Sequence, residues 1–297
     1  MHSNKMISGV KKFCSDFFEG DFFGLAAEIS FYLLSTFLPM IILVFTVASS
    51  ISLNYTDAMF KALQVLPKDV EKLIVSMLSS RTESNTVISI TAFLSLTTMS
   101  GFILTSEKAL IRFYKIEDNR GFWASKITSV IFAVLIFITI IASFGLIIFG
   151  RIIGIAIARN GSGPEALKLW NLSRYLVLSL FIAIVICALY KTLPTVKIKL
   201  WEVLPGAIFT TIGWYVASFL FALYVNNFPQ YEIIYGSLAG FACMIMWIYL
   251  ISIVILAGAK INAMIYRHRQ SKREQKNNSV QNKEITFEKT ENVKIAD

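Results

Sequence analysis

The stretch that decides the fold is residues 203–259, VLPGAIFTTIGWYVASFLFALYVNNFPQYEIIYGSLAGFACMIMWIYLISIVILAGA, in which Glu232 is the one charged side chain. A water-soluble helical pair of this length would carry charges along its solvent-facing sides. A lipid bilayer excludes them instead, because a span needs roughly 20 apolar residues and a charge at its centre costs several kcal/mol. The stretch therefore predicts two membrane-spanning helices joined by a short connection around Glu232.

The same segregation of charge recurs along the rest of the chain. Residues 29–56, 84–106, 127–150 and 175–190 are free of charge, although the chain holds 28 basic and 19 acidic residues. Hydrophobic residues make up 56% of the sequence and mean hydropathy is +0.64. The apolar stretches lack the period-two alternation of a β-barrel. The predicted fold class is an all-α polytopic membrane protein with six transmembrane helices, at 29–52, 86–106, 127–150, 172–193, 203–225 and 237–259.

An even number of spans places both termini on one side of the membrane, and the basic residues indicate which side. Segments that would face the cytoplasm hold 20 Lys and Arg residues, whereas those that would face outward hold 8. This bias follows the positive-inside rule. The sequence thus predicts a multi-pass protein of the cytoplasmic membrane with both termini in the cytoplasm. The bias also accounts for most of the net charge of +9, so no nucleic-acid partner is expected.

Three segments outside the spans differ in composition. Residues 1–28 place apolar side chains at helical spacing beside charged ones, which predicts an amphipathic helix in the cytoplasmic interface or packed beneath the bundle. The outer loop 53–85 has a helix-start signal at Pro67 and predicts a small helical cap on the 29–266 transmembrane domain. Residues 267–297 are polar, with a basic start, and hold too few large apolar residues to fold. We expect a disordered cytoplasmic tail there.

Prolines and glycines mark places where the spans bend or approach each other closely. Two prolines fall inside predicted spans, where each removes a backbone donor. Both a transport site and a simple packing kink tolerate such a break. Glycines spaced four residues apart, or next to alanine, let helices pack tightly, either within one chain or in a homo-oligomer. The residues of this set are Pro39, Pro205, Gly206, Gly236, Gly240 and Gly258, with Gly150 and Gly154 as a further pair.

An ordered set of motifs resembles a known family of membrane proteins. The motifs are the run Ala27-Glu28-Ile-Ser-Phe31-Tyr32-Leu-Leu-Ser35-Thr-Phe37-Leu-Pro39, then Leu204-Pro205-Gly206-Ala207, Trp214, Tyr235-Gly236-Ser237-Leu238, Trp247, Gly258-Ala259 and Asn262-Ala263. Over residues 10–266 this set resembles the BrkB/YihY family, formerly mislabelled ribonuclease BN. The resemblance implies a six-helix protein of the cytoplasmic membrane with no settled biochemical activity.

The chain departs from the family pattern at two positions. Many members carry Gly-Ala-Glu-Leu-Asn, where this sequence has Gly258-Ala259-Lys260-Ile261-Asn262 and so reverses the charge. After Gly101, where members often show Ala-Leu-Asn, this chain has Glu107-Lys108-Ala109-Leu110-Ile111. Our hypothesis is that Glu107 and Lys260 form a compensating ion pair at the cytoplasmic ends of spans two and six.

Three classes of function compete for these residues. An enzyme needs a nucleophile, an acid–base pair or metal ligands, but the only histidines, His2 and His268, lie in predicted tails. No catalytic residue, metal or cofactor is predicted, and a ribonuclease is disfavoured. Transport of a polar or amphiphilic solute, such as a lipid or envelope precursor, is preferred. A non-catalytic scaffold or assembly partner is the alternative, and membrane lipids are the expected partners. The polar residues singled out for function are Glu28, Tyr32, Glu107, Glu202, Asn226, Tyr235, Lys260 and Asn262.

Overall fold

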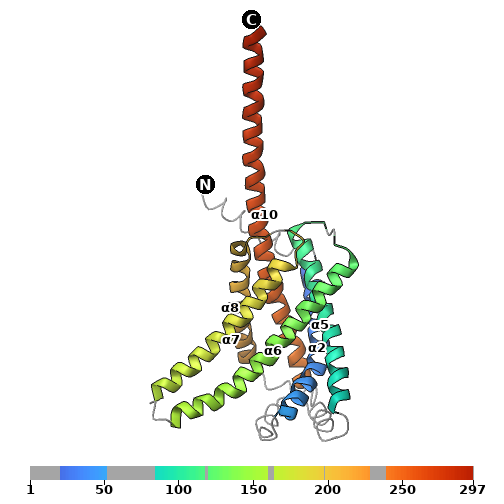
Figure 1. Ribbon diagram of the computed structural model, residues 1–297, viewed down its shortest axis with the longest axis vertical. Helices are drawn as coiled ribbons and strands as arrows, with labels where there is room; N and C mark the ends of the chain where they lie inside the picture. Colours follow the sequence, from blue (N-terminus) through green and yellow to red (C-terminus); the bar gives the residue numbers. More distant parts are fainter. Residues whose placement is uncertain are drawn as a thin grey trace.

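The computed structural model describes residues 21–51, 84–117, 120–159, 164–196, 198–227 and 239–296. All regular secondary structure in these segments is helical. The helices are α2 (Phe22–Ile51), α5 (Ser84–Tyr114), α6 (Phe122–Arg159), α7 (Pro164–Thr192), α8 (Leu200–Asn227) and α10 (Ala239–Ala296), as Figure 1 shows. The prediction of an all-α fold is confirmed for this part of the chain.

Within the same segments, five helices are long and apolar enough to cross a membrane. Their apolar parts are Phe22–Leu43, Ile88–Tyr114, Phe122–Ile140, Leu200–Val225 and Ala239–Gln275. α7 contributes a shorter apolar segment, Leu176–Thr192, at the position of the predicted fourth span. Five of the six predicted spans are therefore supported by length and composition, and the count of six stays a prediction.

Several helices extend beyond the charge-free stretches that predicted them. α2 begins at Phe22, so Glu28 lies inside the helix, and α5 runs past Glu107 to Tyr114. A helix satisfies its own backbone hydrogen bonds, so it need not end where the hydrocarbon ends. The predicted amphipathic helix falls largely within residues 1–20, and the predicted helical cap within residues 52–83; both lie outside the described residues.

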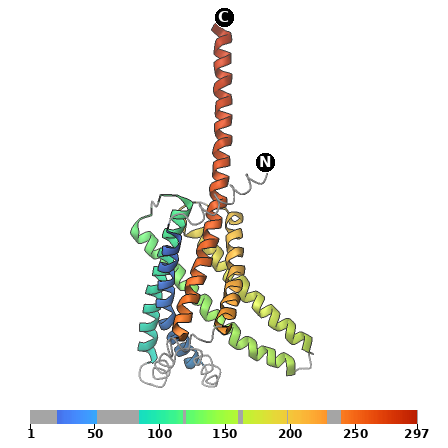
Figure 2. The same cartoon turned by 180° about the vertical axis from the view of Figure 1, so that it is seen from behind.

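α10 differs most from what the sequence predicts. It runs from Ala239 to Ala296 as one helix of 58 residues and projects far beyond the other helices (Figures 1 and 2). A disordered tail was expected from Arg267 onward. No proline or glycine follows Gly258, and the tail is rich in Lys, Glu, Gln and Arg, which favour helix. A composition that cannot form a core can still extend a helix that the bundle has already nucleated.

Successive helices run in opposite directions, so their ends gather at two levels (Figures 1 and 2). We call the level at which α10 leaves the bundle the exit end. There an ion pair of 4.0 Å joins Asp21, before α2, to Arg112 of α5. The Phe22 and Phe113 rings stack nearby, with centroids 6.2 Å apart. α6 and α7 form a hairpin whose far half leans away from α2, α5, α8 and α10 (Figure 1).

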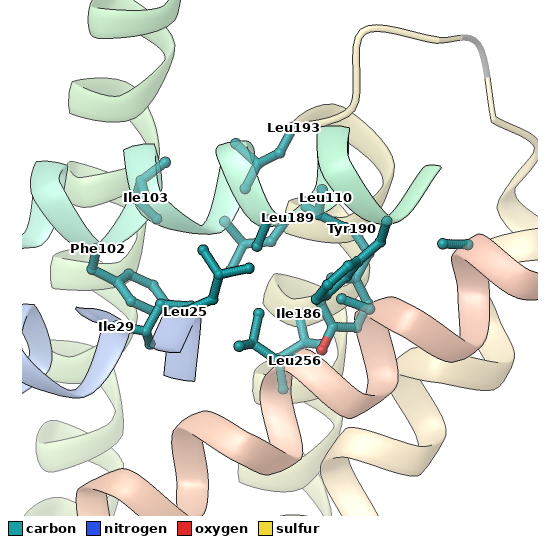
Figure 3. Close-up of a cluster of buried hydrophobic side chains, with 14 of the residues drawn as sticks. Leu25, Ile29, Phe102, Ile103, Leu110, Ile186, Leu189, Tyr190, Leu193 and Leu256 are labelled. Atoms are coloured by element: carbon teal, nitrogen blue, oxygen red, sulfur yellow. The ribbon is translucent and has the colours of Figure 1, made fainter. Parts of the chain in front are cut away.

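The apolar core lies toward the exit end, where α2, α5, α7 and α10 converge. Figure 3 shows its labelled side chains: Leu25, Ile29, Phe102, Ile103, Leu110, Ile186, Leu189, Tyr190, Leu193 and Leu256. Lipid tails are as apolar as leucine, so close packing rather than the hydrophobic effect holds such a core together in a membrane. This packed region gives the neighbouring polar groups a rigid frame.

The outward faces of the helices are apolar. On α8, exposed apolar side chains recur along one stripe: Ile208, Phe209, Ile212, Val216, Phe219, Leu220 and Leu223. A stripe of this length would be unfavourable in water and suits contact with hydrocarbon. Polar side chains that point inward from the same helices therefore stand out.

Candidate functional site

α8 and α10 cross closely at Gly206 and Gly258. A Cβ placed on Gly206 would stand 2.2 Å from the carbonyl oxygen of Gly258. A Cβ on Gly258 would stand 2.0 Å from Oγ1 of Thr210 and 2.6 Å from the carbonyl oxygen of Gly206. Only glycine lets the two backbones approach this far, as in other small-residue crossings of membrane helices.

Asn262 lies one turn after Gly258 on α10 and closes the crossing. Its side chain is fully buried, and its Oδ1 accepts a hydrogen bond of 2.7 Å from the backbone N–H of Gly206. This contact fixes the orientation of the amide, because a backbone N–H can only donate. Nδ2 lies beside Gly206 as well, where a Cβ would stand 2.4 Å from it, and it has no hydrogen-bond partner among the described residues.

Tyr190 brings α7 to the same crossing. Its hydroxyl donates to the carbonyl oxygen of Ile255 at 2.5 Å and lies 2.8 Å from Oγ1 of Thr210. Since the tyrosine proton is directed to Ile255, the Thr210 hydroxyl donates to the tyrosine oxygen. We call Tyr190, Gly206, Thr210, Gly258 and Asn262 the crossing cluster. It joins three helices through buried polar contacts.

Glu107, near the end of α5, is a buried carboxylate at the exit end. Its Oε1 lies 3.3 Å from the guanidinium of Arg120, and its Oε2 accepts a hydrogen bond from the Ser125 hydroxyl. Arg120 also donates to the carbonyl oxygens of Thr192 at 3.1 Å and Pro194 at 3.3 Å. One arginine thus ties the end of α5 to the end of α7 through charge-assisted hydrogen bonds.

The structure gives Glu107 a different cation from the one that the sequence suggested. The ion pair forms with Arg120, in the connection between α5 and α6. Lys260 is also buried, and its Nζ lies 4.7 Å from the ring centre of Phe113 and 6.0 Å from that of Phe22. A lysine ammonium over aromatic faces is a favourable arrangement away from water. Lys260 therefore lies in the aromatic contact between α2 and α5.

Glu202 is a second buried carboxylate, in the first turn of α8. Its Oε1 lies 3.3 Å from the guanidinium of Arg269 on α10, and its Oε2 accepts a hydrogen bond of 3.1 Å from the backbone N–H of Lys199. A negative charge in the first turn also complements the helix dipole. We call Glu107–Arg120 and Glu202–Arg269 the exit-end ion pairs. They fasten α5 to α7 and α8 to α10.

Glu28 and Tyr32 lie on a polar seam between α2 and α5, apart from the crossing cluster. The Thr105 hydroxyl donates to Oε1 of Glu28 at 2.9 Å. The Tyr32 ring packs on Gly101, where a Cβ would stand 2.4 Å from two ring carbons. Gly101 therefore lets the tyrosine reach the interior of this seam.

The remaining predicted residues are scattered. Pro39 lies inside α2, and Pro205 lies inside α8 beside Gly206. Gly240 is exposed in the first turn of α10. Asn226 lies near the end of α8, opposite the exit end. Tyr235 and Gly236 lie outside the described residues. The structure thus brings Gly206, Gly258 and Asn262 into one cluster and leaves the others apart from it.

Sequence reasoning missed three residues that matter here: Arg120, Tyr190 and Arg269. Each contacts a partner in another element of the fold, so the pairing depends on how the helices pack. One signal was present for Arg120. A carboxylate as close to a span as Glu107 needs a cation once it is buried, and Arg120 is one of the two arginines between the second and third predicted spans.

Comparison with known proteins agrees with the motifs. The sequence model of the virulence factor BrkB matches residues 13–283. The chain is 30% identical over 248 residues to the ribonuclease-like protein YfkH of Bacillus subtilis, covering 82% of this chain and 90% of YfkH. It is 39% identical over 77 residues to a UPF0761 membrane protein of Pseudoalteromonas translucida, covering 26% of each chain. No solved structure matches. The chain belongs to the BrkB virulence-factor family of membrane proteins, also known as BrkB/YihY.

Proposed function

We propose that this protein transports a polar or amphiphilic solute, such as a lipid or envelope precursor, across the cytoplasmic membrane. The observation that carries the proposal is the crossing cluster, a set of buried polar groups inside helices whose outward faces are apolar. The cluster faces the interior of the bundle near the exit end of the spans, and polar groups that face a bundle interior usually mark a functional pathway. The unpartnered Nδ2 of Asn262 adds support, because most buried polar atoms are hydrogen-bonded.

The exit-end ion pairs act as a gate in this proposal. Glu107–Arg120 fastens α5 to the end of α7, and Glu202–Arg269 fastens α8 to α10. Breaking these pairs frees α7 and α10 to separate from their neighbours and opens the crossing cluster to one side. Transporters commonly work by rocking one group of helices against another. The α6–α7 hairpin, which already leans away from the other helices (Figure 1), is the group that moves.

The proposal includes six spans with the exit end in the cytoplasm. The positive-inside rule supports this orientation, because exposed basic side chains gather at the exit end. They are Lys108, Arg112, Lys115, Lys191, Lys199 and Arg269. The α7 segment is short for a span, and a tilted or locally thinned bilayer accommodates it.

Reconstitution tests the transport proposal. The purified protein is placed in liposomes with labelled phosphatidylglycerol, phosphatidylcholine or small osmolytes, and movement across the bilayer is measured. We expect movement of at least one of these solutes, and a loss of at least tenfold in Asn262→Ala and Glu28→Gln. Ser173→Ala is the matched control, because its hydroxyl is exposed and donates to the carbonyl oxygen of Trp170 in its own helix. Equal movement by all variants would contradict the proposal.

A scaffold is the second candidate, and the projecting part of α10 favours it. This helix continues past Arg269 with exposed, charged side chains, a surface that a partner protein can read without any solute crossing the membrane. Co-purification of one stable partner, lost when residues 275–297 are removed, with no solute movement in liposomes, would support the scaffold. In both cases we propose no enzymatic activity, and RNA incubated with the purified protein should stay intact.

A further inference from the structure

We propose that the outward side of α7 and α8 binds an anionic phospholipid. Lys191 and Lys199 hold its phosphate group at the exit end, and its acyl chains lie along the two helices. The inference goes beyond the proposed transport function, because this lipid stays on the outside of the bundle and is not the solute that crosses it. It therefore does not depend on transport.

The first argument is that α7 and α8 share one outward surface. The hydroxyls of Ser179 and Tyr215 lie 2.6 Å apart and form a hydrogen bond between the two helices. Leu180 and Val216, the residues that directly follow them, are 62% and 50% exposed. A helix turns by about 100° per residue, and α7 and α8 run in opposite directions (Figure 1). Side chains that follow the two contact residues therefore point to the same side of the pair.

The second argument is that this surface is apolar over the length of an acyl chain. Exposed aliphatic side chains recur on one face of each helix: Leu176, Leu180 and Ile184 on α7, and Ile208, Ile212 and Val216 on α8. We call these six residues the α7–α8 surface. Between Leu180 and Lys191 the helix rises roughly 16 Å, about half of the roughly 30 Å hydrocarbon layer. The surface thus suits the chains of one leaflet.

The third argument is that a polar and aromatic end caps the α7–α8 surface. Lys191 is exposed in the last turn of α7, and Lys199 is exposed directly before α8. The bond between Tyr190 and Thr210 brings the end of α7 beside the start of α8, so both lysines lie at the exit end. Trp201, in the first turn of α8, is 77% exposed, and tryptophan is enriched at the level of lipid headgroups.

The fourth argument is charge. Glu202 is the only acidic residue in the sequence between Glu165 and Glu232. Although its Oε2 accepts a hydrogen bond from the backbone N–H of Lys199, its carboxylate is buried and paired with Arg269 at 3.3 Å. The two exposed lysines therefore keep a positive field, which favours an anionic headgroup. A nucleic acid or an acidic protein would match the charge but not the apolar surface below it.

Thermal unfolding of the full chain in neutral detergent, with native mass spectrometry to count retained lipids, tests the inference. The probes are phosphatidylglycerol, phosphatidylcholine and glycerol phosphate, which carries the anionic group without acyl chains. We expect phosphatidylglycerol to stay bound and to raise the unfolding midpoint by a few degrees, whereas the other two leave it unchanged. An equal response to phosphatidylcholine overturns the proposal, because charge would then not matter. An equal response to glycerol phosphate or to RNA overturns it as well, because the chains would not matter.

The double variant Lys191→Gln/Lys199→Gln removes both charges. Since both side chains are exposed, we expect the midpoint without lipid to stay the same and the affinity for phosphatidylglycerol to fall at least tenfold. Lys191→Arg/Lys199→Arg keeps the charge and should retain the affinity. Lys168→Gln is the matched control, because it removes an exposed lysine near the other end of α7.

The variants overturn the proposal in two ways. One is full affinity for phosphatidylglycerol in the double glutamine variant, and the other is an equal loss in Lys168→Gln. If the double glutamine variant does not fold, the comparison of phosphatidylglycerol with phosphatidylcholine on the unaltered chain still decides. Phosphatidylglycerol binding without solute movement in liposomes would contradict transport and support this inference. Solute movement without such binding would do the reverse.

Discussion

Among single residues, Gly258 is a position where a small change has a large expected effect. In Gly258→Ala the new Cβ would meet the Gly206 carbonyl oxygen at 2.6 Å and Oγ1 of Thr210 at 2.0 Å. A backbone oxygen cannot turn aside as a flexible side chain can, so α10 must move away from α8. We expect the variant to lose about 1–3 kcal/mol of stability, the usual cost of overpacking, measured as a lower midpoint of thermal unfolding in detergent.

Gly121→Ala is the control for this substitution, since a Cβ at Gly121 would meet nothing within 4 Å. It should unfold like the unaltered protein. Equal midpoints for the two alanine variants would contradict the close crossing of α8 and α10.

Residue types alone predicted part of the candidate site. Gly206 and Gly258 were singled out because glycine next to alanine inside a span allows close packing, and both lie at the crossing. The role of Asn262 depends on the Gly206 N–H of another helix, which no local pattern encodes. The Glu107–Lys260 hypothesis named a cation other than Arg120 for the same reason. Charge type along the sequence does not reveal which cation the fold brings to a buried carboxylate.

Among the elements, the tie between α5 and α7 depends on one ion pair. Arg120→Gln leaves the Glu107 carboxylate buried with the Ser125 hydroxyl as its recorded donor. Removing one partner of a buried pair typically costs about 3–5 kcal/mol, whereas removing both charges costs less. We expect Arg120→Gln to lower the unfolding midpoint more than the double variant Glu107→Gln/Arg120→Gln does. A double-mutant cycle checks this, and strictly additive effects would argue against a direct pair.

The projecting part of α10 is helical in the structure, whereas the sequence predicts a disordered tail there. Glu274→Pro places a residue that costs about 3 kcal/mol in a helix interior at an exposed position past the bundle. We expect helical circular dichroism to fall while the unfolding midpoint of the bundle stays the same. Glu274→Ala is the control. Identical spectra for the two variants would show that the tail is not helical in solution, as its composition alone predicts.

The elements themselves could be predicted well, and their limits could not. Charge-free stretches located the spans because a bilayer excludes charge wherever a helix crosses it. The same signal ends at the edge of the hydrocarbon, so it missed the turns of α5 from Glu107 to Tyr114 and the start of α2 at Phe22. The lean of the α6–α7 hairpin depends on contacts between helices distant in sequence, which a charge pattern does not record.

For the whole molecule, the expected topology places Lys115 and Gln275 on the same side of the membrane and Glu165 on the other. Single cysteines at these positions, in a chain without Cys14, Cys187 and Cys243, can be labelled with a reagent that does not cross membranes. We expect Glu165→Cys to react in intact cells, and Lys115→Cys and Gln275→Cys to react only after the cells are opened. Different accessibility of Lys115→Cys and Gln275→Cys would rule out an even number of spans between these two positions.

The unbroken course of α10 has a mechanical consequence. Residues 269–296 reach roughly 40 Å into the aqueous phase at about 1.5 Å per residue. The part of α10 inside the bundle carries Gly258 and Asn262. Because the helix is continuous, a tilt of that part also moves the projecting part. A tilt of about 10° would displace the tip by about 7 Å, on the same helical rise. If the exit end faces the cytoplasm, as proposed, a movement of the bundle would be carried by this helix about 40 Å beyond it.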